Sequence, residues 1–291
     1  MILLNRLIVI FVALQITSCS NTSPNPPPEV AKAESSPFDK GMGDLLREHY
    51  QDAIVHFSKA ILADSIRGEV FYQRGYSKFK LKDYAGAMED FKVQIKFTQK
   101  LADSYYYLAE CFDDLGERDD AISSYSKAIE ANPKYSEAYN NRGLLENSKH
   151  DYEHALKDFN QAILLDSTMY QSYLNLGLSL INIKEYQEAI YDFTKAISIQ
   201  PFDPHSFFNR GVAFYYLKEY NSAMKDFSQA IHLDNKYGPA YANLGIVYYK
   251  LHKSDEACQS WKAGMEVGDT ESKDNYNELC LKKRPSQDKH T

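Results

Sequence analysis

Apolar residues recur along this chain with a fixed period of 34 residues. In each period an alanine is followed four residues later by an aromatic residue and eight residues later by isoleucine or methionine. The alanines are Ala53, Ala87, Ala121, Ala155, Ala189, Ala223 and Ala257. The aromatic residues are Phe57, Phe91, Tyr125, Phe159, Phe193, Phe227 and Trp261. Positions i, i+4 and i+8 lie on one face of a helix, so each period predicts a helix with one apolar face.

A helix is also predicted upstream of each alanine, and we call it the first helix of the repeat. A small residue lies twelve positions before each alanine, at Gly41, Gly75, Ala109, Gly143, Gly177, Gly211 and Gly245. An aromatic residue precedes it by four positions in repeats two to seven, at Phe71, Tyr105, Tyr139, Tyr173, Phe207 and Tyr241. The second helix opens with tyrosine in five repeats, at Tyr50, Tyr84, Tyr152, Tyr186 and Tyr220. We expect the paired helices to approach closely, with Gly143 facing Ala155.

This pattern resembles the tetratricopeptide repeat (TPR) family over residues 34–271, in seven repeats without an insertion. The resemblance implies an all-α fold, a right-handed α-solenoid of seven 34-residue helix-turn-helix repeats. The terminal repeats depart from the pattern. Pro37 replaces the aromatic residue in the first repeat, and Gly264 replaces an alanine found in most of the others. Such departures are expected where a repeat lacks a neighbour.

Residues 272–291 are predicted to form a capping helix, at Asp274–Lys283, and a polar tail. The four cysteines, Cys19, Cys111, Cys258 and Cys280, form no CxxC motif. A disulfide between Cys258 and Cys280 is one hypothesis, because it would join the cap to the last repeat. The alternative is that Cys258 is simply a small core residue.

The N-terminus has the features of an export signal. Residues 1–18 contain Arg6 and the apolar run Leu7–Leu14, which is shorter than the roughly 20 residues that span a bilayer. Ile16-Thr17-Ser18-Cys19 resembles the lipobox of bacterial lipoproteins, which implies that Cys19 becomes the lipidated N-terminus. Residues 19–33 would then be a disordered tether rich in serine and proline.

The signal predicts a lipid-anchored protein of the bacterial envelope, in the outer membrane and facing the periplasm. Ser20 after the cysteine favours this location weakly, because aspartate there would resemble an inner-membrane retention signal. An ordinary cleaved signal with a chance cysteine is the alternative, and it would give a secreted or periplasmic soluble protein.

Composition and motifs argue against nucleic-acid binding and catalysis. The net charge is -7 and there is no lysine or arginine cluster. No HExxH, Walker or G-x-S-x-G motif occurs, so we predict no enzyme, no cofactor and no small-molecule substrate. His150 and His154 are interpreted as a solvated pair rather than a metal site, because a closed site needs about four ligands. The acids Asp103, Glu110, Asp113 and Asp114 are interpreted as a charged patch.

The TPR resemblance places a peptide-binding groove on the first helices. Two positions before the small residue stand Asn141, Asn175, Asn209 and Asn243. They resemble the asparagine ladder of some family members, in which side-chain amides bind a peptide backbone. An amide offers both a donor and an acceptor, which suits a peptide group of any sequence. The alternative is that asparagine is merely tolerated there as a solvated residue.

Apolar residues beside the ladder would form the groove wall. Candidates at one and four positions after the small residue are Leu144, Leu178, Val212, Tyr215, Ile246 and Tyr249. Some of them are alternatively core residues. The basic clamp that binds chaperone carboxylates in some relatives is missing, since Asn140, His205 and Asn209 stand at matching places.

We therefore predict a protein-protein interaction scaffold that binds an extended peptide segment in its groove. A structural subunit docked through its outer face is the alternative. An enzyme with an unrecognised site is a third possibility, which an activity dependent on Asp113 or Asp114 would support.

Overall fold

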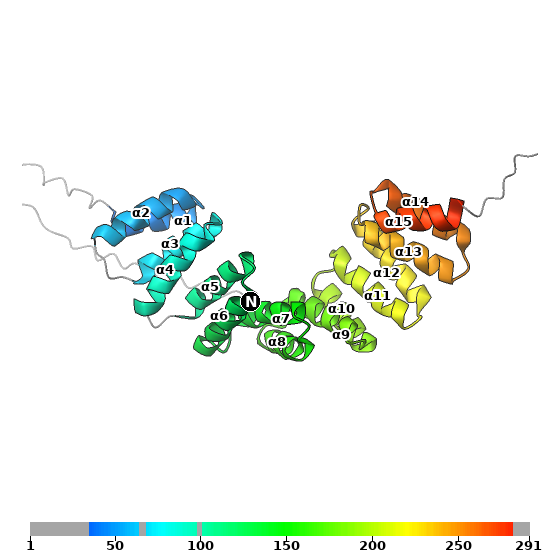
Figure 1. Ribbon diagram of the computed structural model, residues 1–291, viewed down its shortest axis with the longest axis horizontal. Coiled ribbons are helices and arrows are strands. Elements are labelled where there is room, and N and C mark those ends of the chain that lie inside the picture. Colours follow the sequence, from blue (N-terminus) through cyan, green and yellow to red (C-terminus); the bar gives the residue numbers. More distant parts are fainter. Residues whose placement is uncertain (1–34, 64–67, 98–100, 282–291) are drawn as a thin grey trace, which may run out of the picture. The chain divides into compact units, whose positions relative to one another are not determined.

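The computed structural model describes residues 35–63, 68–97 and 101–281, which fold into fifteen α-helices and one π-helix without strands. The predicted signal peptide and the predicted tether at residues 19–33, Cys19 included, lie outside these residues. Successive helices pack against one another in chain order (Figure 1). The described part of the chain is thus an α-solenoid of seven helix pairs with a C-terminal cap, and the predicted fold class is confirmed.

Each repeat contributes one first helix and one second helix. The first helices are α1 Pro37–Leu46, α3 Gly68–Lys80, α5 Ala102–Asp114, α7 Ser136–Ser148, α9 Tyr170–Asn182, α11 Pro204–Tyr216 and α13 Gly238–Lys250. The second helices are α2 Tyr50–Ala63, α4 Tyr84–Phe97, α6 Arg118–Ala131, α8 Tyr152–Leu165, α10 Tyr186–Ile199, α12 Tyr220–Leu233 and α14 Ser254–Glu266. Tyrosine opens the second helix in the five repeats where the sequence predicts it.

The core is built from the alanines and aromatic residues of the repeat. Phe57, Phe91, Phe159, Phe193 and Phe227 are fully buried, as are all seven repeat alanines. Burial of an aromatic ring of this size contributes about 2–3 kcal/mol per residue before entropy is subtracted. Because each ring lies between neighbouring helices, the array is stabilised repeat by repeat.

The predicted facing of Gly143 and Ala155 stays a prediction, and the side chains nearest to Gly143 are those of Asp158 and Phe159. A methyl group added to Gly143 would lie 3.0 Å from Cε1 of Phe159 and 3.2 Å from Cβ of Asp158. Gly177 and Gly211 face Phe193 and Phe227 in the same way. The missing side chain therefore makes room for the aromatic ring one helical turn after the alanine.

The turn between the two helices of a repeat contains a residue with a left-handed backbone. These residues are Glu48, Lys82, Gly116, His150, Lys184, Lys218 and His252, with φ between 60° and 79°. Glycine adopts this conformation without strain, whereas the other side chains adopt it at a cost of about 1 kcal/mol. Only repeat three has glycine here, so the turns of the other six repeats are strained.

The C-terminal cap begins earlier than Asp274. After Gly268, whose φ is +91°, Asp269 caps the helix α15 Thr270–Asn275 by accepting a hydrogen bond from the Ser272 amide. The π-helix η1 Tyr276–Leu281 follows directly. Gly264 allows this packing, because a methyl group there would lie 2.2 Å from Ser272 Oγ. The cap therefore explains why the last repeat lacks alanine at this position.

Cys258 on α14 and Cys280 on η1 form a disulfide with a Cα–Cα distance of 5.8 Å. This bond closes a loop of 22 residues and joins the end of the cap to the last repeat. A cross-link of this length stabilises a chain mainly by restricting its unfolded states. It therefore holds the cap on the end of the array.

Candidate functional site

The four asparagines of the predicted ladder lie on the first helices α7, α9, α11 and α13, and each is half-buried. Their hydrogen bonds differ from repeat to repeat. Asn141 donates from Nδ2 to Tyr106 Oη at 3.0 Å and to Glu110 Oε1 at 2.8 Å. Its Oδ1 accepts a hydrogen bond from Asn140 Nδ2 at 3.0 Å. Both ends of the Asn141 amide are therefore engaged within the chain, where they tie α7 to α5.

The remaining three ladder amides are less constrained. Asn175 donates to Asn140 Oδ1 at 3.1 Å, and Asn243 donates to the Pro239 carbonyl of its own helix at 2.9 Å. In both, the amide oxygen makes no hydrogen bond to the described residues. Asn209 makes none with either end of its amide within the same part of the chain. Asn175 and Asn209 are thus the adjacent positions with the most capacity for an external peptide.

The predicted apolar wall divides into exposed and packed residues. The side chain of Leu144 is 41% exposed and that of Tyr249 is 38% exposed. Leu178, Val212 and Tyr215 are half-buried and pack against core clusters, and Ile246 is also half-buried. The first helices therefore offer apolar contact at both ends of the ladder, while its middle part is shared with the core.

Repeats two and three, where the ladder is absent, carry a tyrosine cluster. The cluster consists of Tyr72, Tyr76, Tyr106, Tyr107 and Tyr135, whose neighbouring ring centroids lie 4.9–6.5 Å apart. Burial and the neighbouring Tyr76 raise the pKa of Tyr107 to about 12. The Tyr107 phenol is therefore neutral at physiological pH and can donate a hydrogen bond.

Three half-buried guanidinium groups were not predicted from the sequence. Arg74, Arg142 and Arg210 lie directly before the small residue of repeats two, four and six. Each makes a bidentate pair with an aspartate sixteen residues later on its own second helix, at N–O distances of 2.6–2.9 Å. Each also donates from Nη1, at 2.9–3.1 Å, to a hydroxyl sixteen residues earlier on the preceding second helix.

We call this arrangement the guanidinium clamp. Its aspartates are Asp90, Asp158 and Asp226, and its hydroxyl residues are Ser58, Ser126 and Thr194. The guanidinium carbon also lies 5.6–5.7 Å from the ring of Phe71, Tyr139 or Phe207. The recurrence of arginine every 68 residues, with aspartate sixteen residues later, was the signal in the sequence.

The side chains with possible metal or thiol chemistry lie apart from one another. His150, in the exposed turn before α8, contacts Tyr152 Oη at 2.8 Å, and His154, in the first turn of α8, contacts Asp151 at 2.8 Å. Within residues 35–63, 68–97 and 101–281 no group of three or more metal-ligating side chains is gathered. Burial raises the pKa of the Cys111 thiol to about 12, so it is protonated at neutral pH. No helix among these residues is long and apolar enough to cross a bilayer.

Models of the tetratricopeptide repeat match residues 102–135, 136–169, 170–203 and 204–237. Two curated relatives are photosystem I assembly proteins Ycf3. The one from Prochlorococcus marinus is 27% identical over 88 residues, which are 29% of this chain and 51% of the relative. The one from a Synechococcus species is 27% identical over 113 residues, which are 34% of this chain and 65% of the relative. The chain thus spans between half and two thirds of the curated relatives that it matches.

Solved structures share the fold at low sequence identity. The C-terminal part of a TPR protein from Cytophaga hutchinsonii has a TM-score of 0.69 at 18% identity, over 81% of this chain and 98% of that chain. The structure of pilF of Pseudomonas aeruginosa has a TM-score of 0.62 at 18% identity, over 72% of this chain and 97% of that chain. YrrB is described as a TPR protein with an unusual peptide-binding site. Its structure has a TM-score of 0.57 at 19% identity, over 65% of this chain and 99% of that chain.

These comparisons agree with the geometry of the helix pairs. The matching models describe repeats and indicate no catalytic family. Proteins built from TPR units are generally adaptors that bind other proteins. Residues 102–237 are therefore four tetratricopeptide repeats, and the described helix pairs form a TPR scaffold of the kind that supports protein-protein interaction.

Proposed function

We propose that this chain is a lipid-anchored scaffold of the bacterial cell envelope that binds an extended segment of a partner protein on its first helices. The observation that carries the proposal is the half-buried amide of Asn209, which has no hydrogen-bond partner in the described part of the chain, next to Asn175 with a free amide oxygen. Two such amides on successive repeats match a peptide backbone, whose groups also donate and accept. Each hydrogen bond would contribute about 1 kcal/mol net.

Other features support binding on this face. Leu144 and Tyr249 provide exposed apolar contact at the ends of the ladder. The curated relatives bear the name of assembly proteins, and one similar structure is described as having a peptide-binding site. These names fit a protein that holds a partner during assembly.

Envelope location is proposed from the N-terminus and the cysteines. The signal-like residues 1–18 and the lipobox-like sequence before Cys19 favour export and lipidation. A disulfide between Cys258 and Cys280 suits an oxidising compartment outside the cytoplasm. The outer membrane, facing the periplasm, is the location we propose.

The binding proposal is tested by cross-linked capture from envelope extract. Wild type would be compared with the double variant Asn175→Ala/Asn209→Ala, and with Asn221→Ala on the exposed surface of α12 as the matched control. We expect one partner to be lost from the double variant and retained by the control. Asn141 is left unchanged, because removing its amide would disturb the contact between α5 and α7.

Retention of every partner by the folded double variant would contradict the ladder. Binding would then be assigned to the second helices, as expected for a structural subunit docked through its outer face. Circular dichroism of the variants separates loss of binding from loss of fold.

The anchor is tested separately by metabolic labelling with a fatty acid. We expect label on the wild type and none on Cys19→Ala. Absence of label from both proteins would reject lipidation without bearing on the ladder.

A further inference from the structure

The residue directly before the small residue alternates between two types, which superimposes a 68-residue period on the 34-residue repeat. Repeats two, four and six have the arginines of the guanidinium clamp. Repeats three, five and seven have Leu108, Leu176 and Leu244, all buried. In repeats two, four and six a guanidinium group lies between two second helices. In repeats three, five and seven a leucine takes its place, and leucine has no group that can pair with a carboxylate.

Repeat five keeps the three partners of a clamp without its arginine. Asp192 lies sixteen residues after Leu176, at the position of Asp158 and Asp226. Asn160 lies sixteen residues before it, where Ser126 and Thr194 accept hydrogen bonds. Tyr173 stands at the place of the aromatic ring under each guanidinium.

In repeat five, where Leu176 takes the place of the longer arginine side chain, there is a cleft of about 320 Å³ lined by residues of α8, α9 and α10. Its apolar lining consists of Leu156, Leu176, Leu180 and Tyr191, and its polar lining of Asn160, Glu188 and Asp192. Tyr191 is 62% exposed, so the cleft is open to the surface of the molecule. The lining suits the apolar stem and planar cation of one long basic side chain.

Asp192 is the unpaired group in this cleft. Only 7% of its surface is exposed, and it has no hydrogen bond or ion pair to the described residues. Burial raises the pKa of Asp192 to about 7. Asn160 donates from Nδ2 to the Leu156 carbonyl at 2.8 Å, which leaves its Oδ1 as a second acceptor. Two acceptors therefore line the cleft from the sequence positions that hold the acceptors of the occupied clamps.

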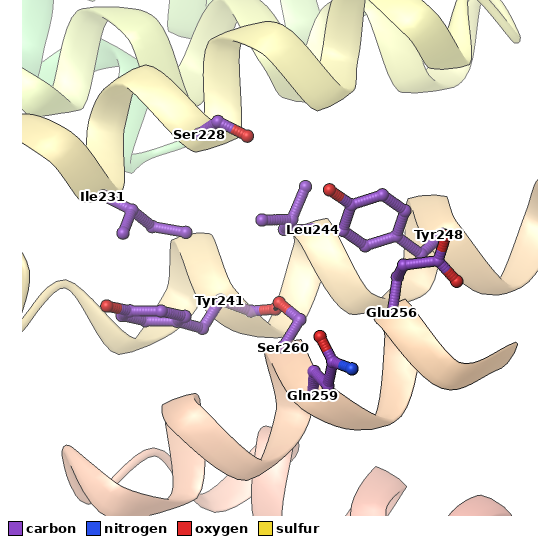
Figure 2. A pocket seen from close by; sticks show the side chains of 8 residues that line it. All are labelled: Ser228, Ile231, Tyr241, Leu244, Tyr248, Glu256, Gln259 and Ser260. Carbon is purple, nitrogen blue, oxygen red and sulfur yellow. Dashed lines mark hydrogen bonds between the residues drawn. The ribbon is translucent and has the colours of Figure 1, made fainter. Parts of the chain in front are cut away.

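Repeats three and seven lack an aspartate at the position of Asp192. Repeat seven has a cleft of about 260 Å³ in which Ser260 stands in place of aspartate (Figure 2). Its hydroxyl donates to the Tyr241 carbonyl at 2.9 Å. Repeat three has Ser124 at this position and Lys92 in place of the acceptor. Within the described repeats the unpaired aspartate is confined to repeat five.

We propose that the cleft of repeat five binds an arginine side chain from a basic segment of a partner protein. The guanidinium would pair with both oxygens of Asp192 and donate to Asn160 Oδ1, as Arg142 and Arg210 do within their repeats. Such a bidentate pair offsets the cost of burying the carboxylate. The net charge of -7 disfavours a second copy of this chain as the donor. This site lies on the second helices and does not depend on the asparagine ladder.

The test uses protein with labelled leucine methyl groups and the probe Nα-acetyl-arginine N-methylamide, followed by NMR at constant ionic strength. One side chain is expected to bind with a Kd of roughly 10–100 mM. The methyl signals of Leu156, Leu176 and Leu180 should shift, while that of Leu244 in the repeat-seven cleft should not. The citrulline analogue, which has the same shape without the charge, should cause no shift.

Two variants make the test specific. Asp192→Asn should weaken the arginine-dependent shifts at least tenfold, and Leu176→Arg should abolish them because it completes the clamp from within. Leu176→Arg should also raise the thermal midpoint, which shows that the variant folds. Equal shifts with citrulline, unchanged binding by Asp192→Asn, or no shift in the wild type would overturn the proposal. Self-association that disappears in Asp192→Asn would instead assign the cleft to a second copy, which also overturns it.

Discussion

The ionised form of the buried Asp192 side chain lowers the free energy of unfolding. Its pKa is raised from 3.8 to about 7 by burial, so the folded protein holds a proton that the unfolded chain has released. Below about pH 4 both states are protonated, and the group has no effect on stability. As the pH rises from about 4 to 7 the unfolded state is favoured, and the full cost is present above pH 7.

We therefore predict that Asp192→Asn raises the free energy of unfolding by about 2 kcal/mol at pH 8 and changes it little at pH 4. Urea unfolding at the two pH values measures this difference. Glu130→Gln, an exposed change on α6 away from the cleft, serves as the control and should leave the stability nearly the same as that of the wild type at both pH values. Equal stability of Asp192→Asn and wild type at pH 8 would contradict the assignment.

Glycines opposite the core rings set the distance between paired helices. A methyl group on Gly177 would lie 2.7 Å from Cε1 of the buried Phe193 ring. We expect Gly177→Ala to lower the free energy of unfolding by about 1–3 kcal/mol, because the ring has no free space to move into. Gly43→Ala is the matched control, since its nearest contact would be Arg47 Nη2 at 3.9 Å. Gly43→Ala should leave the stability unchanged or raise it slightly. The midpoints of thermal unfolding of the two variants and the wild type measure the difference.

At the scale of elements, the guanidinium clamp joins three helices through one side chain. Arg210 on α11 binds Asp226 on α12 and Thr194 on α10, and its partner Asp226 is buried. We predict that Arg210→Leu lowers the free energy of unfolding by about 3 kcal/mol, because it leaves a buried carboxylate unpaired.

The double variant Arg210→Leu/Asp226→Ser should recover most of that loss. It reproduces the pairs Leu108–Ser124 and Leu244–Ser260 that repeats three and seven already contain. Urea unfolding of the single and double variants makes the comparison. A double variant as unstable as the single one would show that the carboxylate is not the cause.

The helices themselves were predictable, because strict recurrence of alanine and aromatic residues fixes both helix faces. The cap was placed too late, since Gly268 and Asp269 carry the start signal and were overlooked. The strained turns could not be predicted from residue type, because lysine, histidine and glutamate occupy a conformation that favours glycine. The repeat context imposes that conformation on them.

The candidate site was only partly predictable from the ladder pattern. The spacing placed Asn141 and Asn209 at equivalent positions, but their surroundings differ. Asn141 has Tyr106 and Glu110 from the preceding repeat as partners, whereas at the places equivalent to these two residues Asn209 has Leu174 and Leu178, which cannot accept. The arginines of the guanidinium clamps recur every 68 residues, which is two repeats. They are therefore not seen when positions 34 residues apart are compared.

At the scale of the whole molecule, the proposed partner lies along the first helices. Site-specific photo-crosslinking tests it most directly. A photoreactive amino acid would be placed at Leu144 on the first helix α7, and in a second protein at Leu164 on the second helix α8, where the side chain is 77% exposed.

We predict that the partner cross-links from Leu144, that the cross-link is lost in Asn175→Ala/Asn209→Ala, and that Leu164 gives none. A partner that cross-links from Leu164 and not from Leu144 would contradict the account.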